Sequence, residues 1–235
     1  MFIGHFAVGL AAKRAAPQTS LGLLIAAPVL ADLLWPAFLL LGWEHVGLNP
    51  DGPPFLRLDF LDYPYSHSLL MDCVWAALFA GGYYAVTRYG PGALMIAIGV
   101  VSHWVLDVIT HVPDMPLTPG ESSAKLGLGL WHSVAGTMAV EIAMFAIGSA
   151  LYLTSTRARD AVGRYAVGAM IAVLFLFYSI SVNAPPPPNL RALGIGGLVF
   201  SSLFLVWAWW GDRHREVVSG SAGVAGVGGV GKVGG

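Results

Sequence analysis

The sequence is poor in charged residues. Asp, Glu, Lys and Arg make up 11% of its 235 residues, against about 25% in a typical soluble domain. Because 56% of the residues are hydrophobic, this scarcity argues against an ordinary soluble protein and indicates a membrane protein. The net charge is -1, and no basic run supplies the positive surface that nucleic-acid binding requires. We therefore expect no nucleic acid among its partners.

Cysteine is almost absent. The one cysteine, Cys73, cannot form an internal disulfide, and it falls within an apolar stretch, so it says little about redox compartment. The order of residues that marks a signal peptide is also missing. The basic pair Lys13 and Arg14 follows the first apolar stretch, 1–12, instead of preceding it. We therefore expect no cleaved signal peptide.

Long apolar runs are abundant. Each is near the roughly 20 residues that a helix needs to cross about 30 Å of hydrocarbon. The sequence therefore predicts an all-α fold, a polytopic membrane helix bundle with about six transmembrane helices. The stretch 1–12 is too short to cross and is expected to form a short interfacial or re-entrant helix. The six predicted spans are 21–41, 66–87, 91–111, 128–154, 165–183 and 190–211.

The basic residues predict the orientation of the bundle. If the six spans alternate in direction, most lysines and arginines fall on one side. The positive-inside rule places that side, and with it both termini, in the cytoplasm. The expected location is the bacterial cytoplasmic (inner) membrane. The residues on the cytoplasmic side are Lys13, Arg14, Arg88, Arg157, Arg159, Arg164, Arg213 and Arg215.

The chain shows no internal repeat of 20 to 50 residues, so 1–216 is predicted to form one transmembrane domain. The remainder, 217–235, is rich in glycine and has no pattern that could bury a face, so we expect it to be disordered. Two predicted outer loops, 42–65 and 112–127, are long and rich in proline and glycine. Active-site loops often have this composition, and so do ordinary connectors.

Three ionisable residues stand four apart in the third predicted span: His103, Asp107 and His111. In a helix this spacing places them on one stripe, because each step turns by only about 40°. Polar groups are costly in lipid, so the stripe needs partners or a ligand. A cation is one candidate.

Other spans bring ionisable residues to a similar depth. At about 1.5 Å per residue, four helices place acids and imidazoles in one layer between the midplane and the outer boundary. One intramembrane histidine or aspartate is often only a hydrogen-bonding residue, but several at matched depth favour a functional site. Glu141 falls nearer the cytoplasmic boundary, at a depth of about 10 Å, and faces roughly the opposite way from His132. It is therefore expected outside the cluster. The layer comprises Asp32, His67, Asp72, His103, Asp107, His111 and His132.

Imidazole nitrogens and carboxylate oxygens are the ligands of zinc and related divalent ions. A bound cation would also offset the burial of Asp32 and Asp107. A catalytic site of this kind keeps one position open for water, so hydrolysis is the expected reaction class. Pro28 and Pro36 bracket Asp32 and predict a kink that frees backbone carbonyls near the site, although prolines also bend helices for shape alone.

Four motifs follow one another in the first half of the chain: GHFAVG at 4–9, ADL at 31–33, YSHSLL at 65–70 and SHWVLDVIT at 102–110. Together they resemble a bacterial family of inner-membrane-associated, metal-dependent hydrolases. The resemblance implies a membrane helix bundle. The metal ligands that it implies are His5, Asp32, His67, His103 and Asp107.

The chain departs from that family in two places. A second acid usually follows the first aspartate, where this chain has Leu33 and Leu34, and a basic residue usually precedes the third motif, where this chain has DYPY at 62–65. The topology also places His5 on the cytoplasmic side. It can join the other ligands only if the stretch 1–12 re-enters the membrane, where it must be covered by protein.

The leading hypothesis is a membrane-embedded, metal-dependent hydrolase that acts on a small amphiphilic substrate, such as a lipid or a lipid phosphate, within a shell of membrane lipids. Under this hypothesis His132 or Asp72 acts as a base or supports a ligand. Ser66 and Ser68 orient ligands, and His111 lies at the rim. The oligomeric state is left open.

Two other functions use the same residues. In an ion- or proton-coupled transporter the cluster would carry the ion or proton, and Glu141 would extend the path to the cytoplasmic side. In a haem-binding electron carrier, histidines of two helices would ligate the iron. The second of these fits poorly, because Asp107 stands between His103 and His111.

Overall fold

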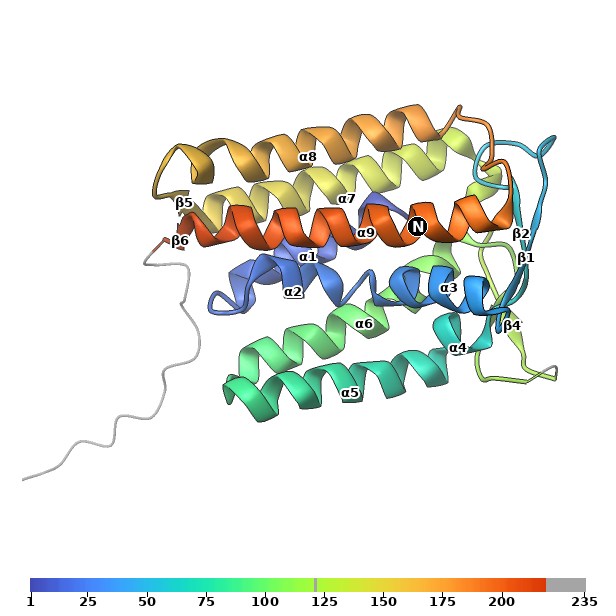
Figure 1. Cartoon of the computed structure of the whole chain (residues 1–235), viewed down its shortest axis with the longest axis horizontal. Coiled ribbons are helices and arrows are strands. Elements are labelled where there is room, and N and C mark those ends of the chain that lie inside the picture. Colours follow the sequence, from blue (N-terminus) through green and yellow to red (C-terminus); the bar gives the residue numbers. More distant parts are fainter. Residues whose placement is uncertain (121, 219–235) are drawn as a thin grey trace, which may run out of the picture.

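The computed structural model describes residues 1–120 and 122–218. In this part of the chain five helices are long and apolar enough to cross a membrane, and they lie along the long axis of the molecule (Figure 1). The predicted all-α membrane bundle is therefore confirmed. The five helices are α5 (Leu69–Thr87), α6 (Gly90–Thr110), α7 (Val134–Ser155), α8 (Ala161–Ser181) and α9 (Leu190–Arg213).

The first predicted span, 21–41, is not one helix. It forms two short helices, α2 (Leu21–Ala26) and α3 (Leu30–Leu41), which follow one another along the bundle (Figure 1). Pro28 lies in the break between them, because proline has no N–H group and its ring clashes with the carbonyl four residues earlier. The structure thus has a broken helix where the sequence predicted a continuous, kinked one.

Helix α1 (Ile3–Ala15) runs through the interior of the bundle and packs most extensively against α7. It is buried on nearly every side, and apart from His5 its residues up to Ala12 are apolar or glycine, as expected for a helix in the interior of a bundle. In a membrane such contacts depend on close approach between small residues. At Gly148 of α7, a Cβ atom would lie 2.4 Å from the carbonyl oxygen of Ala7. The predicted short N-terminal helix therefore lies within the bundle, not at its surface.

Short strands and turns close the two ends of the bundle (Figure 1). The end with β5 and β6 also holds the turns with most of the basic residues, as the alternation of spans predicted. The other end holds two antiparallel hairpins and two short helices. The strands are β1 (His45–Leu48) with β2 (Leu58–Asp62), β3 (Met115–Pro116) with β4 (Lys125–Leu126), and β5 (Thr156–Ala158) with β6 (Arg215–Val217). The short helices are α4 (Pro64–His67) and the 3-10 helix η1 (Leu130–His132).

The boundary expected between domain and tail shifts slightly. Val217, the first residue of the predicted disordered tail, belongs to β6 and pairs with Thr156 of β5. Residues 219–235 lie outside the described residues.

A buried ion pair ties several helices together near the end of the bundle that holds β5 and β6. Asp212 of α9 accepts hydrogen bonds from Lys13 Nζ at 2.6 Å and from the backbone N–H of Leu21 at 2.9 Å, both at Oδ2. Its Oδ1 accepts a hydrogen bond from the hydroxyl of Tyr152 at 2.9 Å. Asp212 thus links α1, the start of α2, and α7 to α9.

Candidate metal centre

Four histidines and two aspartates converge inside the bundle, at the end that carries the β1–β2 hairpin. We call them the His/Asp cluster. They come from four helices and from the first residue after α6, which is why segments far apart in the sequence meet here. The members are His5 of α1, Asp32 of α3, His67 of α4, His103 and Asp107 of α6, and His111.

Asp107 is the centre of the cluster. Its Oδ1 lies 3.0 Å from Nε2 of His5. Its Oδ2 lies 3.2 Å from Nε2 of His103, 3.6 Å from Nε2 of His111 and 4.0 Å from Nε2 of His67. The i, i+4 spacing along α6 places His103 and His111 one turn to either side of Asp107, so one helix supplies the middle of the cluster.

Three histidines are held through the ring nitrogen that faces away from Asp107. Nδ1 of His103 bonds the carbonyl oxygen of Pro28 at 2.8 Å, and Nδ1 of His111 bonds Asp114 Oδ1 at 2.9 Å. Nδ1 of His67 bonds the hydroxyl of Ser66 at 2.7 Å. With the proton on Nδ1, each Nε2 presents a lone pair toward Asp107. Metal-binding histidines are oriented in this way by partners behind them.

The carbonyl of Pro28 is available because the helix is broken there. Kinks in helices free carbonyl groups from the regular hydrogen-bond ladder. Pro28 and Pro36 predicted free backbone carbonyls near the site, and the carbonyl of Pro28 is the one that His103 contacts.

Glu44 supports His67 from behind, and no motif or spacing in the sequence predicts this contact. Oε1 of this buried carboxylate accepts hydrogen bonds at 2.8 Å from the backbone N–H groups of Tyr65 and Ser66. Its Oε2 accepts the hydroxyl of Ser66 at 2.6 Å. Because Ser66 donates to Glu44, it must accept the Nδ1 proton of His67.

The first residues of the chain also reach the cluster. The amino group of Met1 contacts Oδ1 of Asp107. The backbone N–H groups of Phe2 and Gly4 donate to Oε2 of Glu141 at 2.8 and 3.2 Å. Glu141 was expected outside the cluster, and it is not a cluster member. It nevertheless holds the start of the helix that carries His5.

His132 does not reach the cluster. The span predicted at 128–154 begins only at Val134, because Gly129 adopts a left-handed conformation with φ of +71° and Ser133 caps the helix by accepting a hydrogen bond from the N–H of Gly136. His132 therefore lies in η1, where it is exposed and its Nδ1 contacts the carbonyl oxygen of Gly129 at 3.1 Å. The depth expected for it assumed a helix that had already begun.

Ser68 and Asp72 lie close by without touching a cluster residue through hydrogen bonds. Ser68 donates to the carbonyl oxygen of Pro64 at 2.6 Å and caps α5. Asp72 is buried, and within the described residues neither of its oxygens has a hydrogen-bond partner at standard geometry. Ser66 is thus the one predicted serine that contacts a cluster histidine.

The donor atoms of the cluster fit a divalent cation. Two groups of three have ligand atoms within 4.8 Å of one another: His5, His103 and Asp107, and Asp32, His67 and His103. In a tetrahedral site with bonds of about 2.1 Å, ligand atoms lie roughly 3.4 Å apart. His103 is shared by both groups, and its Nε2, 3.2 Å from Oδ2 of Asp107, is buried without a hydrogen bond of standard geometry in the described part of the chain. A cation between these atoms would satisfy it.

A cavity of about 440 Å³ opens onto the cluster. His67, Asp107 and His111 form its polar wall, together with Asp32, whose side chain is 37% exposed. Most of the remaining wall is apolar, with Arg57 as the one basic side chain among its lining residues. The cluster is therefore buried from the surrounding membrane but reachable through a cavity.

No protein-family model, curated protein or solved structure matches the chain.

Proposed function

We propose that this protein is a membrane-embedded, metal-dependent hydrolase that acts on an amphiphilic substrate. One observation carries the proposal: three histidines are anchored through Nδ1, and their Nε2 atoms converge on one carboxylate. Nε2 of His103 is buried and lies 3.2 Å from Oδ2 of Asp107, yet within the described residues it makes no hydrogen bond of standard geometry. A cation held between the two atoms would account for this approach.

The metal ligands in this proposal are His5, His103 and Asp107, with Asp32 and His67 completing the set. Nitrogen and carboxylate donors at these positions favour zinc. When bound, a divalent ion would acidify a water molecule and polarise a carbonyl or phosphoryl oxygen. The resemblance of the four sequence motifs to metal-dependent membrane hydrolases points to the same chemistry.

His111 is suited to act as general base. Its Nδ1 donates to Asp114, which orients the ring and stabilises the imidazolium form. Its Nε2 lies 3.6 Å from Oδ2 of Asp107, too far for a hydrogen bond, and can accept a proton. His111 lies in the wall of the cavity and outside both groups of candidate ligands. In the proposed reaction, Nε2 takes the proton of the attacking water and returns it to the leaving group. His111 therefore replaces His132 and Asp72 as the candidate base.

The amount of bound metal tests the proposal directly. Elemental analysis of the detergent-purified protein should give stoichiometric zinc, and His103→Ala and Asp107→Ala variants should lose it. His132→Ala is the matched control, because His132 is exposed and away from the cluster. A parent protein without any stoichiometric transition metal would contradict the proposal, as would equal zinc in all four proteins.

Activity gives the second readout. Hydrolysis of a panel of lipid esters and lipid phosphates should stop after chelation and return when zinc is added. The His111→Gln variant should keep its zinc but lose most of its turnover, and the acidic limb of its pH profile should disappear. Full turnover in this variant would remove His111 as the base.

Transport is the competing function, and two buried acids favour it. Asp72 and Glu141 both have carboxylate oxygens without hydrogen-bond partners in the described part of the chain. Glu141→Gln is a poor discriminator, because Glu141 holds the start of α1 and thereby His5. Asp72→Asn is better: a hydrolase should keep its zinc and turnover, whereas a proton-coupled transporter should lose uptake in proteoliposomes.

A further inference from the structure

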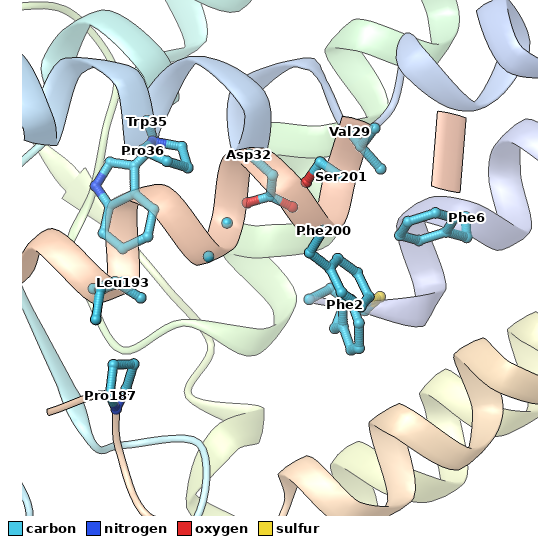
Figure 2. A pocket seen from close by; sticks show the side chains of 14 residues that line it. Phe2, Phe6, Val29, Asp32, Trp35, Pro36, Pro187, Leu193, Phe200 and Ser201 are labelled. Carbon is cyan, nitrogen blue, oxygen red and sulfur yellow. The ribbon is translucent and has the colours of Figure 1, made fainter. Parts of the chain in front are cut away.

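A second cavity, of about 320 Å³, lies between α1, α3 and α9. Figure 2 shows its wall: the side chains of Phe2, Val29, Leu193 and Phe200 surround it, and the carboxylate of Asp32 lies at its edge beside Ser201. Apart from these two polar side chains, the lining side chains are apolar. A polar substrate alone would gain nothing from this cavity.

The apolar cavity adjoins the cavity of the candidate metal centre. Both are lined by Met1, Asp32, Trp35 and Pro187. Asp32 is a candidate ligand and stands where the two cavities meet. A molecule that filled both would therefore have its polar part at the His/Asp cluster and its apolar part beside α9.

Two glycines of α9 leave room for such a molecule. Gly196 is exposed, and a Cβ atom there would have no heavy atom within 4 Å. At Gly197 a Cβ atom would meet only Pro36, at 3.0 Å. Because α9 is a candidate membrane span and its neighbouring residues Ile195 and Val199 are exposed, the opening at these glycines faces the hydrocarbon of the bilayer. The molecules available there are lipid chains.

Arg57 supplies a charge at the other end of the path. It lines the larger cavity, and within the described residues its side chain contacts only the carbonyl oxygens of Gly52 and Ala184. No acid there neutralises its guanidinium group. An unpaired arginine beside a polar cavity suits a phosphate or a carboxylate, which it can bind through two parallel hydrogen bonds.

We propose that the substrate is a membrane lipid with an anionic headgroup. One acyl chain enters between α3 and α9 at Gly196 and Gly197, and the headgroup lies against the His/Asp cluster with its charge on Arg57. This inference rests on the proposed hydrolase function, and it adds the substrate class and the route of access.

Photolabelling tests the chain site without requiring turnover. The probe is phosphatidic acid with a diazirine at the end of one acyl chain, mixed at a low fraction into phosphatidylcholine nanodiscs that hold the full chain. Labels should concentrate on the residues that line the apolar cavity, above all Phe2 and Phe200. Gly197→Leu should reduce this labelling at least fivefold. Gly168→Leu is the matched control, since Gly168 lies on exposed α8 with open space around it.

The headgroup site has its own variant. Excess unlabelled phosphatidic acid should compete with the probe more strongly than diacylglycerol does, and Arg57→Gln should remove this difference. Labels spread evenly over the lipid-facing residues of α8 and α9 would indicate surrounding lipid only and would overturn the proposal. Unchanged labelling in Gly197→Leu would do the same.

Zinc analysis on the same samples separates the two proposals. Labelling of the cavity in a protein without zinc would support the lipid site and contradict the proposed hydrolase function. Stoichiometric zinc without cavity labelling would support the metal centre and contradict the lipid site.

Discussion

Ser66 joins a buried acid to a histidine of the cluster. Glu44 fixes the Ser66 hydroxyl, and the hydroxyl in turn fixes the tautomer and direction of His67. Such partners behind a ligand commonly contribute 10- to 100-fold to metal affinity. The two serines that flank His67 look alike in the sequence, yet only one of them has this position.

This difference gives a prediction at the scale of single residues. Ser66→Ala should weaken zinc binding by about 10- to 100-fold, as measured by competition with a chromophoric chelator. Ser68→Ala removes the cap of α5 but leaves the hydrogen bond of His67 in place, so its zinc affinity should stay within about threefold of the parent. Equal losses in the two variants would contradict the role given to Ser66.

Some residues of the cluster could be predicted from the sequence because their relation is local. His103 and Asp107 lie one turn apart on a single helix, and any regular helix brings them together. Glu44 and Glu141 could not be predicted in this way. Glu141 meets Gly4, which is 137 residues away in the chain, and no spacing rule covers such a distance. Most of their hydrogen-bond partners are backbone N–H groups, which carry no sequence signal.

At the scale of helices, membrane depth was estimated from a rise of about 1.5 Å per residue. This estimate explains why residues of α6 were placed correctly and why His132 was not. It worked for α6, which is regular from Gly90 to Thr110. It failed for His132, because the apolar run began before the helix did. Apolar composition indicates that a segment lies in the membrane region, but it does not show where the backbone begins to coil. The cap at Ser133 was the local signal for the true start.

The packing of α1 against α7 gives a second prediction. Gly148→Ala should lower the thermal stability of the protein in detergent, because the new Cβ atom would lie 2.4 Å from the Ala7 carbonyl oxygen and overpacking costs about 1–3 kcal/mol. Zinc affinity should fall as well, since α1 carries His5. Gly168→Ala is the control. It has no neighbour to displace and gains helix propensity, so a drop of similar size there would refute the explanation.

At the scale of the whole molecule, Asp212 links three segments to α9. Its removal leaves Lys13 buried without its partner, and breaking a buried ion pair in this way costs about 3–5 kcal/mol. We expect Asp212→Ala to unfold at a markedly lower temperature, measured by thermal unfolding in detergent.

A surface ion pair provides the comparison. Glu216 pairs with exposed Arg157 at 2.6 Å, and exposed pairs of this kind contribute less than about 1 kcal/mol. Glu216→Gln should therefore change the unfolding temperature little. If it destabilised the protein as strongly as Asp212→Ala, burial would not be the cause.

The orientation in the membrane gives a fourth prediction. The positive-inside rule places the end with β5 and β6 in the cytoplasm. In a Cys73→Ser background, a membrane-impermeant maleimide applied to intact bacterial cells with a permeable outer membrane should label Ala124→Cys and spare Ala158→Cys. Both positions are exposed, and they lie at opposite ends of the bundle. The reverse pattern would invert the topology.

The central place of α1 sets the order in which the protein can be completed. This helix is made before the others, yet its main packing partner, α7, is synthesised more than a hundred residues later. Until α7 is inserted, Glu141 cannot hold the start of α1, and His5 has no fixed place beside Asp107. A chain interrupted before α7 would therefore enter the membrane without a complete His/Asp cluster, so the cluster forms only when the bundle closes.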